Sequence, residues 1–183
     1  MVPDQQQDVP LVAANPFTHA DILAILSERG WLTVEATPEI EAWCAHAATM
    51  LGGHAADRSA LGEVLALVFH YDAREIIARV ESHEVLARYA ARDVVRQVAL
   101  FLLEDGPRLD SDRFKELVTK LKEEMELRGR ELFHPIRLAL AGRAGEGELD
   151  RVILLLDEAS ALPFAVPVKS ARARILEFCA ALT

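Results

Sequence analysis

Cysteine and histidine are the residue types in this chain that could bind a metal ion or act as nucleophiles. The chain has two cysteines and six histidines, and Cys44 and His46 are spaced like half of a zinc site. No second pair of ligands has a matching spacing, and the nearest histidine pair, His46 and His54, is interrupted by the helix-ending sequence Gly52-Gly53. We therefore expect Cys44 and Cys179 to be reduced core residues, and we expect the chain to bind no metal or other cofactor.

Serine nucleophiles and phosphate-binding loops also lack the context that their chemistry needs. The glycine-containing sequence of residues 142–147 connects two expected helices rather than a strand and a helix, which favours a simple turn over a phosphate loop. The lysines of LVTKLKEE lie on an amphipathic helical pattern. No nucleophile-elbow sequence surrounds the serines Ser59, Ser82, Ser111, Ser160 and Ser170. The sequence therefore predicts no catalytic residues.

Basic side chains gather in one part of an otherwise acidic chain. The formal net charge is −9, which argues against a general polyanion binder because phosphate contacts need clustered Lys and Arg. Residues 1–107 hold 7 basic and 16 acidic side chains, whereas residues 108–183 hold 13 of each. Residues 113–143 alone hold eight basic and five acidic side chains. If the chain binds RNA, we expect the contacts in this segment: Arg113, Lys115, Lys120, Lys122, Arg128, Arg130, Arg137 and Arg143.

Helices must carry these side chains, because the apolar residues recur with a helical period. Thr18 is expected to cap a helix that stops at Gly30, Thr37-Pro38 to open a second and Asp57 to cap a third. One long helix is expected over about residues 82–103, with Tyr89 in its apolar stripe.

The second half of the chain continues the helical pattern. The clearest period follows an Asp110 cap and ends at Gly129, with the apolar stripe Phe114, Leu117, Val118, Leu121 and Met125. Further helices are expected over about residues 132–140, 148–156 and 168–182, the last opened by Pro167. No convincing strand alternation occurs, so we predict an all-α fold.

Length and composition suggest one domain or two small packed subdomains. The chain has 183 residues, of which 51% are hydrophobic, so it can bury a core. We expect a flexible leader over residues 1–16, an N-terminal helical subdomain over 17–106 and a C-terminal one over 107–183, divided at Asp105-Gly106-Pro107. The apolar stretches are too short to span a membrane and the N-terminus lacks a secretory pattern, so we expect a cytoplasmic protein without a membrane partner.

The most specific string is GRELFHPIRLALAGRAGEGELDRVILLL, residues 129–156. It resembles the signature of the C-terminal anticodon-binding domain of bacterial glutamyl-tRNA synthetases, in which a glycine turn, an apolar pair and Pro-Leu-Arg precede an apolar helix that ends at glycine. DRSALGEVLALVFHYD (residues 57–72) and PVKSARARILEF resemble other parts of that domain, so the resemblance covers about residues 19–182. The positions that fit the signature are Phe133, Pro135, Arg137, Ala139, Leu140 and Gly142.

The resemblance implies an all-α helical cage of two packed subdomains in which the anticodon bases of tRNA-Glu are splayed and read one by one. It implies that Arg137 offers the planar, five-donor fork of its guanidinium to a base. Together with the basic segment, it gives these expected RNA-binding residues: Arg137, Arg143, Glu146, Gly147, Leu149, Arg58, Lys120, Lys122 and Arg130.

The chain departs from the family pattern at two positions. Glu146-Gly147 stands where the family has Ser or Thr followed by Pro, and Asp57 stands at the place of a base-contacting arginine, with Arg58 one position later. A carboxylate at position 146 can accept from a cytosine amino group but repels phosphates, and an acid at a helix start is also favoured by the helix dipole. The ATP-site motifs of class I synthetases do not occur in the sequence.

These observations leave three functions open. The first is a non-catalytic tRNA-binding module, which acts in tRNA aminoacylation beside a separate catalytic body. The second is a paralogue that no longer reads RNA and binds a synthetase-like or other protein through its acidic first part. The third is a fragment of a full glutamate–tRNA ligase. DNA is not an expected partner.

Overall fold

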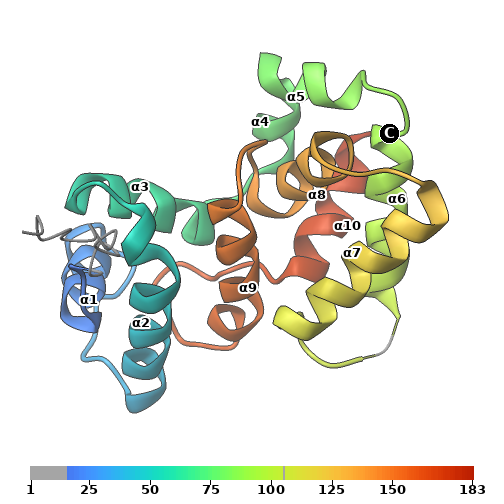
Figure 1. The fold of residues 1–183 in the computed structure, drawn as a ribbon. Helices are drawn as coiled ribbons and strands as arrows, with labels where there is room; N and C mark the ends of the chain where they lie inside the picture. Colours follow the sequence, from blue (N-terminus) through green and yellow to red (C-terminus); the bar gives the residue numbers. More distant parts are fainter. Residues whose placement is uncertain (1–15, 105) are drawn as a thin grey trace, which may run out of the picture.

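The computed structural model describes residues 16–104 and 106–183, so residues 1–15 of the expected leader lie outside the described part (Figure 1). Within these ranges every regular element is helical, which confirms the all-α prediction. The elements are α1 (His19–Glu28), α2 (Pro38–Leu51), the short 3-10 helix η1 (Gly52–His54), α3 (Arg58–Phe69), α4 (Ala73–Ala78), α5 (Val80–Leu86), α6 (Ala91–Leu103), α7 (Ser111–Met125), α8 (Arg130–Ala141), α9 (Glu148–Ser160) and α10 (Ala171–Ala181).

The helices form two neighbouring groups with α9 between them. Figure 1 shows α1, α2 and α3 at one end and α5, α6, α7, α8 and α10 at the other. Helix α9 packs against α2, α3 and α8, and α10 packs against α4, α6 and α8. Helices α9 and α10 therefore both contact helices that precede residue 105. The division into subdomains at residues 106/107 stays a prediction.

Three predicted helix starts are confirmed by side-chain caps. The Thr37 hydroxyl accepts a hydrogen bond from the Ile40 amide at 3.2 Å, at the start of α2. Asp57 accepts from the Ala60 amide at 2.7 Å, and Asp110 accepts from the Arg113 amide at 2.8 Å. Each cap satisfies an amide in the first turn that has no partner within its helix.

An aromatic cluster joins α2, α3 and the segment after α9. The rings of Trp31 and Phe69 stack with centroids 4.6 Å apart, and Trp43 meets Phe69 and Phe164 edge-on at 5.9 and 5.3 Å. The buried Trp43 indole donates to the Leu155 carbonyl at 3.2 Å, so its polar atom is satisfied. This cluster fixes α3 against α9, two helices whose ends form the site described below.

The predicted long helix over residues 82–103 is wrong, because two shorter helices occupy this range. Helix α5 ends at Leu86 and α6 begins at Ala91, and Ala90 between them adopts a left-handed conformation with φ 61°. Tyr89, expected in the apolar stripe, is 87% exposed. Helix α5 packs on α4 and α8, whereas α6 packs on α7, α8 and α10. Packing against different partners separates the helices where the apolar period alone continues.

Two further helix ends differ from the prediction. Gly129, expected to end the helix behind Asp110, is instead the N-cap of α8 with φ 61°, and α7 already ends at Met125. The last helix begins at Ala171 rather than near residue 168, because the Ser170 hydroxyl caps it by accepting from the Ala173 amide at 3.2 Å. In both cases a local hydrogen bond or backbone conformation, rather than the apolar period, sets the end.

The left-handed residue at the end of α7 gives a testable stability effect. Glu126 has φ 53° and ψ 32°, which a glycine adopts without the steric cost of a Cβ atom. We expect Glu126→Gly to raise the free energy of unfolding by about 0.5 kcal/mol, because roughly 1–2 kcal/mol of strain is relieved and the larger entropy of unfolded glycine offsets part of it. Urea unfolding would measure the change. The same substitution inside α7, Glu124→Gly, should lower stability by about 1 kcal/mol, and a less stable Glu126→Gly variant would contradict the argument.

Candidate functional site

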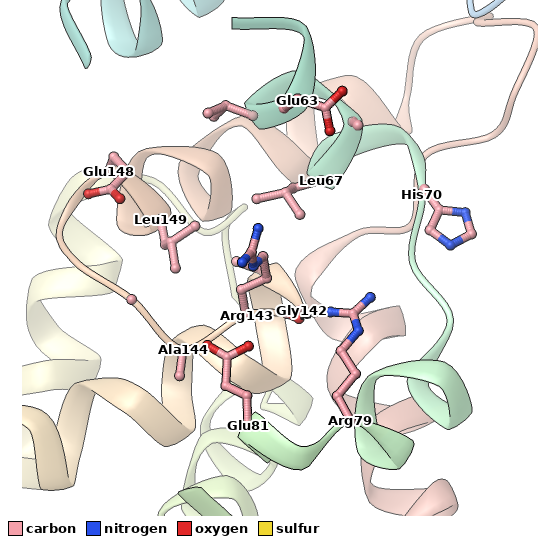
Figure 2. Close-up of a pocket in the computed structure, with 14 residues that line it drawn as sticks. Glu63, Leu67, His70, Arg79, Glu81, Gly142, Arg143, Ala144, Glu148 and Leu149 are labelled. Carbon is pink, nitrogen blue, oxygen red and sulfur yellow. Dashed lines mark hydrogen bonds between the residues drawn. The ribbon is translucent and has the colours of Figure 1, made fainter. Parts of the chain in front are cut away.

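A cavity of about 490 Å³ opens between α3, the start of α5 and the turn that joins α8 to α9 (Figure 2). Its apolar wall is formed by Val64, Leu67 and Leu149. Its charged and titratable lining residues are Glu63, His70, Arg79, Glu81, Arg143 and Glu148. Figure 2 shows Arg143 in the middle of this group, between Leu67 and Arg79.

The α8–α9 turn owes its shape to glycine. Gly142 ends α8 with φ 82°, and a Cβ atom there would lie 3.2 Å from the Ile76 side chain. Its carbonyl accepts a hydrogen bond from the Arg79 Nη1 at 3.0 Å, which ties the turn to the segment between α4 and α5. A residue other than glycine would strain the backbone and press on Ile76. The predicted turn over residues 142–147 thus forms one edge of the cavity.

Arg137 braces the same turn from α8. It is only 9% exposed, and its Nε and Nη2 donate to the two Asp150 carboxylate oxygens at 2.8 and 2.9 Å. Its Nη1 donates to the Gly145 carbonyl at 2.7 Å, and its guanidinium lies 4.8 Å from the centre of the Phe133 ring. Three of the five N–H groups of the guanidinium are therefore bound within the protein. Arg137 does not line the cavity, and its expected contact with a base stays a prediction.

The structure separates the other residues expected to contact RNA into three places. Arg143 and Leu149 line the cavity, while Glu146 lies exposed on the turn and Gly147 is the N-cap of α9. Arg130 approaches Glu146 at 3.9 Å, and Lys122 lies 5.7 Å from the centre of the Phe133 ring, so both belong to the neighbourhood of α8. Arg58 pairs with Glu28 at 2.6 Å and Lys120 lies on α7, so these two are elsewhere.

Arg79 and Glu81 complete the cavity with His70, but these two were not singled out in the sequence. Arg79 precedes α5 and Glu81 lies in its first turn, where no motif marks them, and only the fold brings them beside residues 142–149. The break between α4 and α5 was the missing information. Because α5 is short and starts at Val80, Arg79 and Glu81 come to face the α8–α9 turn.

The charges of the cavity are mixed. Arg79 and Arg143 face the carboxylates of Glu63, Glu81 and Glu148 across the same space. A phosphate, which accepts hydrogen bonds and carries negative charge, would be repelled by the three carboxylates. A flat neutral ring that both donates and accepts, and that can pack on Leu67 and Leu149, matches this lining better.

A buried arginine holds two walls of the cavity together. Arg174 of α10 is fully buried and donates to the carbonyls of Leu67 at 2.9 Å, Val68 at 2.7 Å, Leu140 at 3.0 Å and Lys169 at 3.1 Å. Leu67 and Leu140 lie at the ends of α3 and α8, whose last residues line the cavity. Burial lowers the pKa of the guanidinium to about 10. It thus stays charged at neutral pH. Nothing in the sequence singled out this residue.

The hydroxyl of Tyr71 belongs to the same buried network. It donates toward the Ala139 carbonyl at 2.5 Å and lies 3.2 Å from the Arg174 carbonyl, and its ring centre lies 4.6 Å from the Arg174 guanidinium. Burial raises the pKa of this phenol well above its usual range. The proton therefore stays on the oxygen, and Tyr71 serves packing rather than proton transfer.

The cysteines and the histidine first considered for metal or thiol chemistry lie in packed or ion-paired positions. Both cysteines are free, and burial raises the pKa of the Cys44 thiol to about 12. His46 pairs with Glu158 at 3.3 Å. The described residues contain no group of three or more His, Cys, Asp or Glu side chains arranged to hold a metal ion. In the same part of the chain, no helix has the length and apolar character needed to cross a membrane.

The residues that build this site fall within a match to a known family. Residues 18–162 match the model of the anticodon binding domain. The chain belongs to the anticodon-binding domain family. The resemblance drawn from residues 129–156 is thereby confirmed.

Two curated relatives link the family to tRNA ligases. The chain is 32% identical over 80 residues to glutamate–tRNA ligase 2 of Syntrophus aciditrophicus, a match that covers 44% of this chain and 16% of the relative. It is 33% identical over 88 residues to the glutamate–tRNA ligase of Carboxydothermus hydrogenoformans, which covers 48% of this chain and 18% of the relative. The match thus spans less than a fifth of either relative's length. No solved structure matches the chain significantly.

Proposed function

We propose that this anticodon-binding domain binds tRNA, with tRNA-Glu as the first candidate, and that it has no catalytic role of its own. A splayed base of the anticodon loop would enter the cavity between α3 and the α8–α9 turn. The observation that carries this proposal is the free guanidinium of Arg143, which lines the cavity and donates a hydrogen bond to no described residue. In the cytoplasm, the domain would act in tRNA aminoacylation beside a separate catalytic body.

The lining of the cavity suits a nucleobase. Arg143 presents a planar set of donors that can meet the acceptor edge of a base. Glu81 and Glu148 also line the cavity as acceptors, and a carboxylate is the natural partner of an exocyclic amino group. Leu67 and Leu149 provide an apolar platform for the ring, as single-stranded RNA recognition requires. The combination favours a base that carries both an amino group and acceptors.

Binding of tRNA-Glu by the purified chain tests this proposal. We expect Arg143→Ala to weaken binding roughly 10-fold, which corresponds to the loss of one good base contact of about 1–3 kcal/mol. Arg172→Ala, which removes an exposed arginine at the start of α10, is the matched control and should bind like the unchanged chain. Fluorescence anisotropy at low salt with labelled tRNA would measure both. Affinity for tRNA-Glu no higher than for an unrelated tRNA would sink the proposal of anticodon reading.

One observation favours a second candidate function. Arg137, the best match to the family's base-reading pattern, donates three hydrogen bonds within the protein, to Asp150 and Gly145. The chain would then be a paralogue that binds a protein, with the acidic residues 1–107 as the contact region for a basic partner. Recovery of a basic protein from nuclease-treated extracts, without affinity for any tRNA, would favour this alternative.

A further inference from the structure

A second surface beside the cavity carries three exposed cations. Arg88, in the turn between α5 and α6, donates from Nη1 to the His134 Nδ1 at 2.9 Å. Lys122 of α7 lies over the Phe133 ring. Arg130 is the first residue of α8, one turn before Phe133 and His134. Three separate segments thus place exposed cations around the first turns of α8. We refer to Arg88, Lys122 and Arg130 as the α8 basic surface.

Exposed acids lie near these cations, but among the described residues only Arg130 has an ion pair. Burial and the neighbouring charges of Arg88, Arg130 and Arg137 lower the pKa of His134, while Glu146 opposes them. Arg130 and Glu146 are 3.9 Å apart, and their side chains are 77% and 73% exposed, so this pair holds little energy. Arg88 and Lys122 have no ion pair with any described residue. The α8 basic surface can therefore accept an anion without first breaking a strong ion pair.

The α8–α9 turn connects this surface to the cavity. Arg143, Ala144 and Gly145 line the cavity. The next residue, Glu146, is approached by Arg130, and the Gly145 carbonyl is bound by Arg137 of α8. A strand of RNA whose base occupies the cavity would therefore cross the turn and reach the α8 basic surface with its adjoining backbone.

We propose that Arg88, Lys122 and Arg130 bind the phosphates next to the base that occupies the cavity. This inference rests on the proposed function and assigns the RNA backbone to a surface of its own. The division follows from the lining of the two places: three carboxylates accompany the two arginines of the cavity, whereas the cations of the α8 basic surface hold at most one exposed ion pair. The cavity selects the base, and the α8 basic surface supplies affinity that depends on salt but not on base identity.

The salt dependence of tRNA binding tests this assignment. Each phosphate contact to a single strand contributes about 0.7 to the slope of log affinity against log salt. The triple variant Arg88→Gln, Lys122→Gln, Arg130→Gln should therefore make that slope less steep by about 2 and weaken binding at low salt. The preference for tRNA-Glu over the same tRNA with a changed anticodon should stay the same in this variant. Arg143→Ala should show the opposite pattern, with a reduced preference and a nearly unchanged slope.

A control variant separates phosphate contacts from a general change of charge. Arg74 of α4, Arg108 before α7 and Arg172 of α10 are exposed arginines away from the cavity and from α8. The variant Arg74→Gln, Arg108→Gln, Arg172→Gln removes the same charge and should keep the slope of the unchanged chain. Equal slopes for all three proteins, or equal losses in both variants, would overturn the assignment while leaving tRNA binding intact. Absence of binding by the unchanged chain would instead overturn the proposed function, and this inference with it.

Discussion

Replacing Arg174 by methionine is expected to remove a large part of the stability of the fold. The change leaves the buried carbonyls of Leu67, Val68 and Leu140 without their donor. Each unsatisfied buried group costs roughly 1–3 kcal/mol, so we expect a loss of about 4 kcal/mol in the free energy of unfolding. A domain of this size has a total of about 5–15 kcal/mol. Urea unfolding followed by circular dichroism would measure the effect.

The environment of Arg174 explains why a single side chain matters this much. No carboxylate of the described residues forms an ion pair with its guanidinium, and the acceptors are backbone carbonyls, several of them in the last turns of α3 and α8. Those carbonyls carry the negative ends of two helix dipoles, so the cation satisfies hydrogen bonds and partial charges at once. A substitution therefore loosens both helices where they border the cavity.

Two variants show whether the hydrogen bonds are responsible. Arg172→Met makes the same change two residues earlier, at an exposed position, and should shift stability by less than about 0.5 kcal/mol. Arg174→Lys keeps the charge but concentrates its donors on one nitrogen, which cannot serve α3 and α8 together, so its loss should be intermediate. An Arg174→Met variant within 1 kcal/mol of the unchanged chain would show that the carbonyls find other donors.

Much of the helical fold could be predicted from the sequence, because local signals there agree with the packing. Asp57 and Asp110 cap the helices that they were expected to cap, and the apolar period of α7 faces the core with Phe114, Leu117, Val118 and Leu121 buried. The string over residues 129–156 identified the family because turn, proline and glycine positions match together. These signals depend on a few neighbouring residues and need no knowledge of the tertiary fold.

The candidate site could be predicted only in part, because distant segments build it. Arg143 and Leu149 were expected from the motif, and both line the cavity. Arg79 and Glu81 could not be expected, because their position depends on the break between α4 and α5. The internal partner of Arg137 was also missed. Asp150 lies 13 positions later, and a bidentate pair between two helices leaves no periodic signature.

Breaking the pair of Arg137 and Asp150 should also have a large effect, because both side chains are mostly buried. Their side chains are 10% and 22% exposed, and two parallel hydrogen bonds of 2.8 and 2.9 Å join them. Removal of one partner leaves the other poorly solvated, so we expect Asp150→Ala and Arg137→Met each to cost about 3 kcal/mol in the free energy of unfolding. The double variant should lose little more than either single one, with a coupling energy of about 2 kcal/mol.

The exposed pair of Arg96 and Asp93 on α6 provides the control cycle. Its side chains are 70% and 61% exposed, so the coupling energy should stay below about 0.5 kcal/mol.

The variants of the Arg137 pair also show whether Arg137 braces the α8–α9 turn or contacts a base. If Arg137 holds the turn, Asp150→Ala must weaken tRNA binding as much as Arg137→Met does, although it removes no protein group that donates a hydrogen bond to the RNA. If Arg137 reads a base, Asp150→Ala should free the guanidinium and leave binding equal or stronger. Near-zero coupling would refute the bracing role, because the turn carrying Arg143 would then keep its shape without the pair.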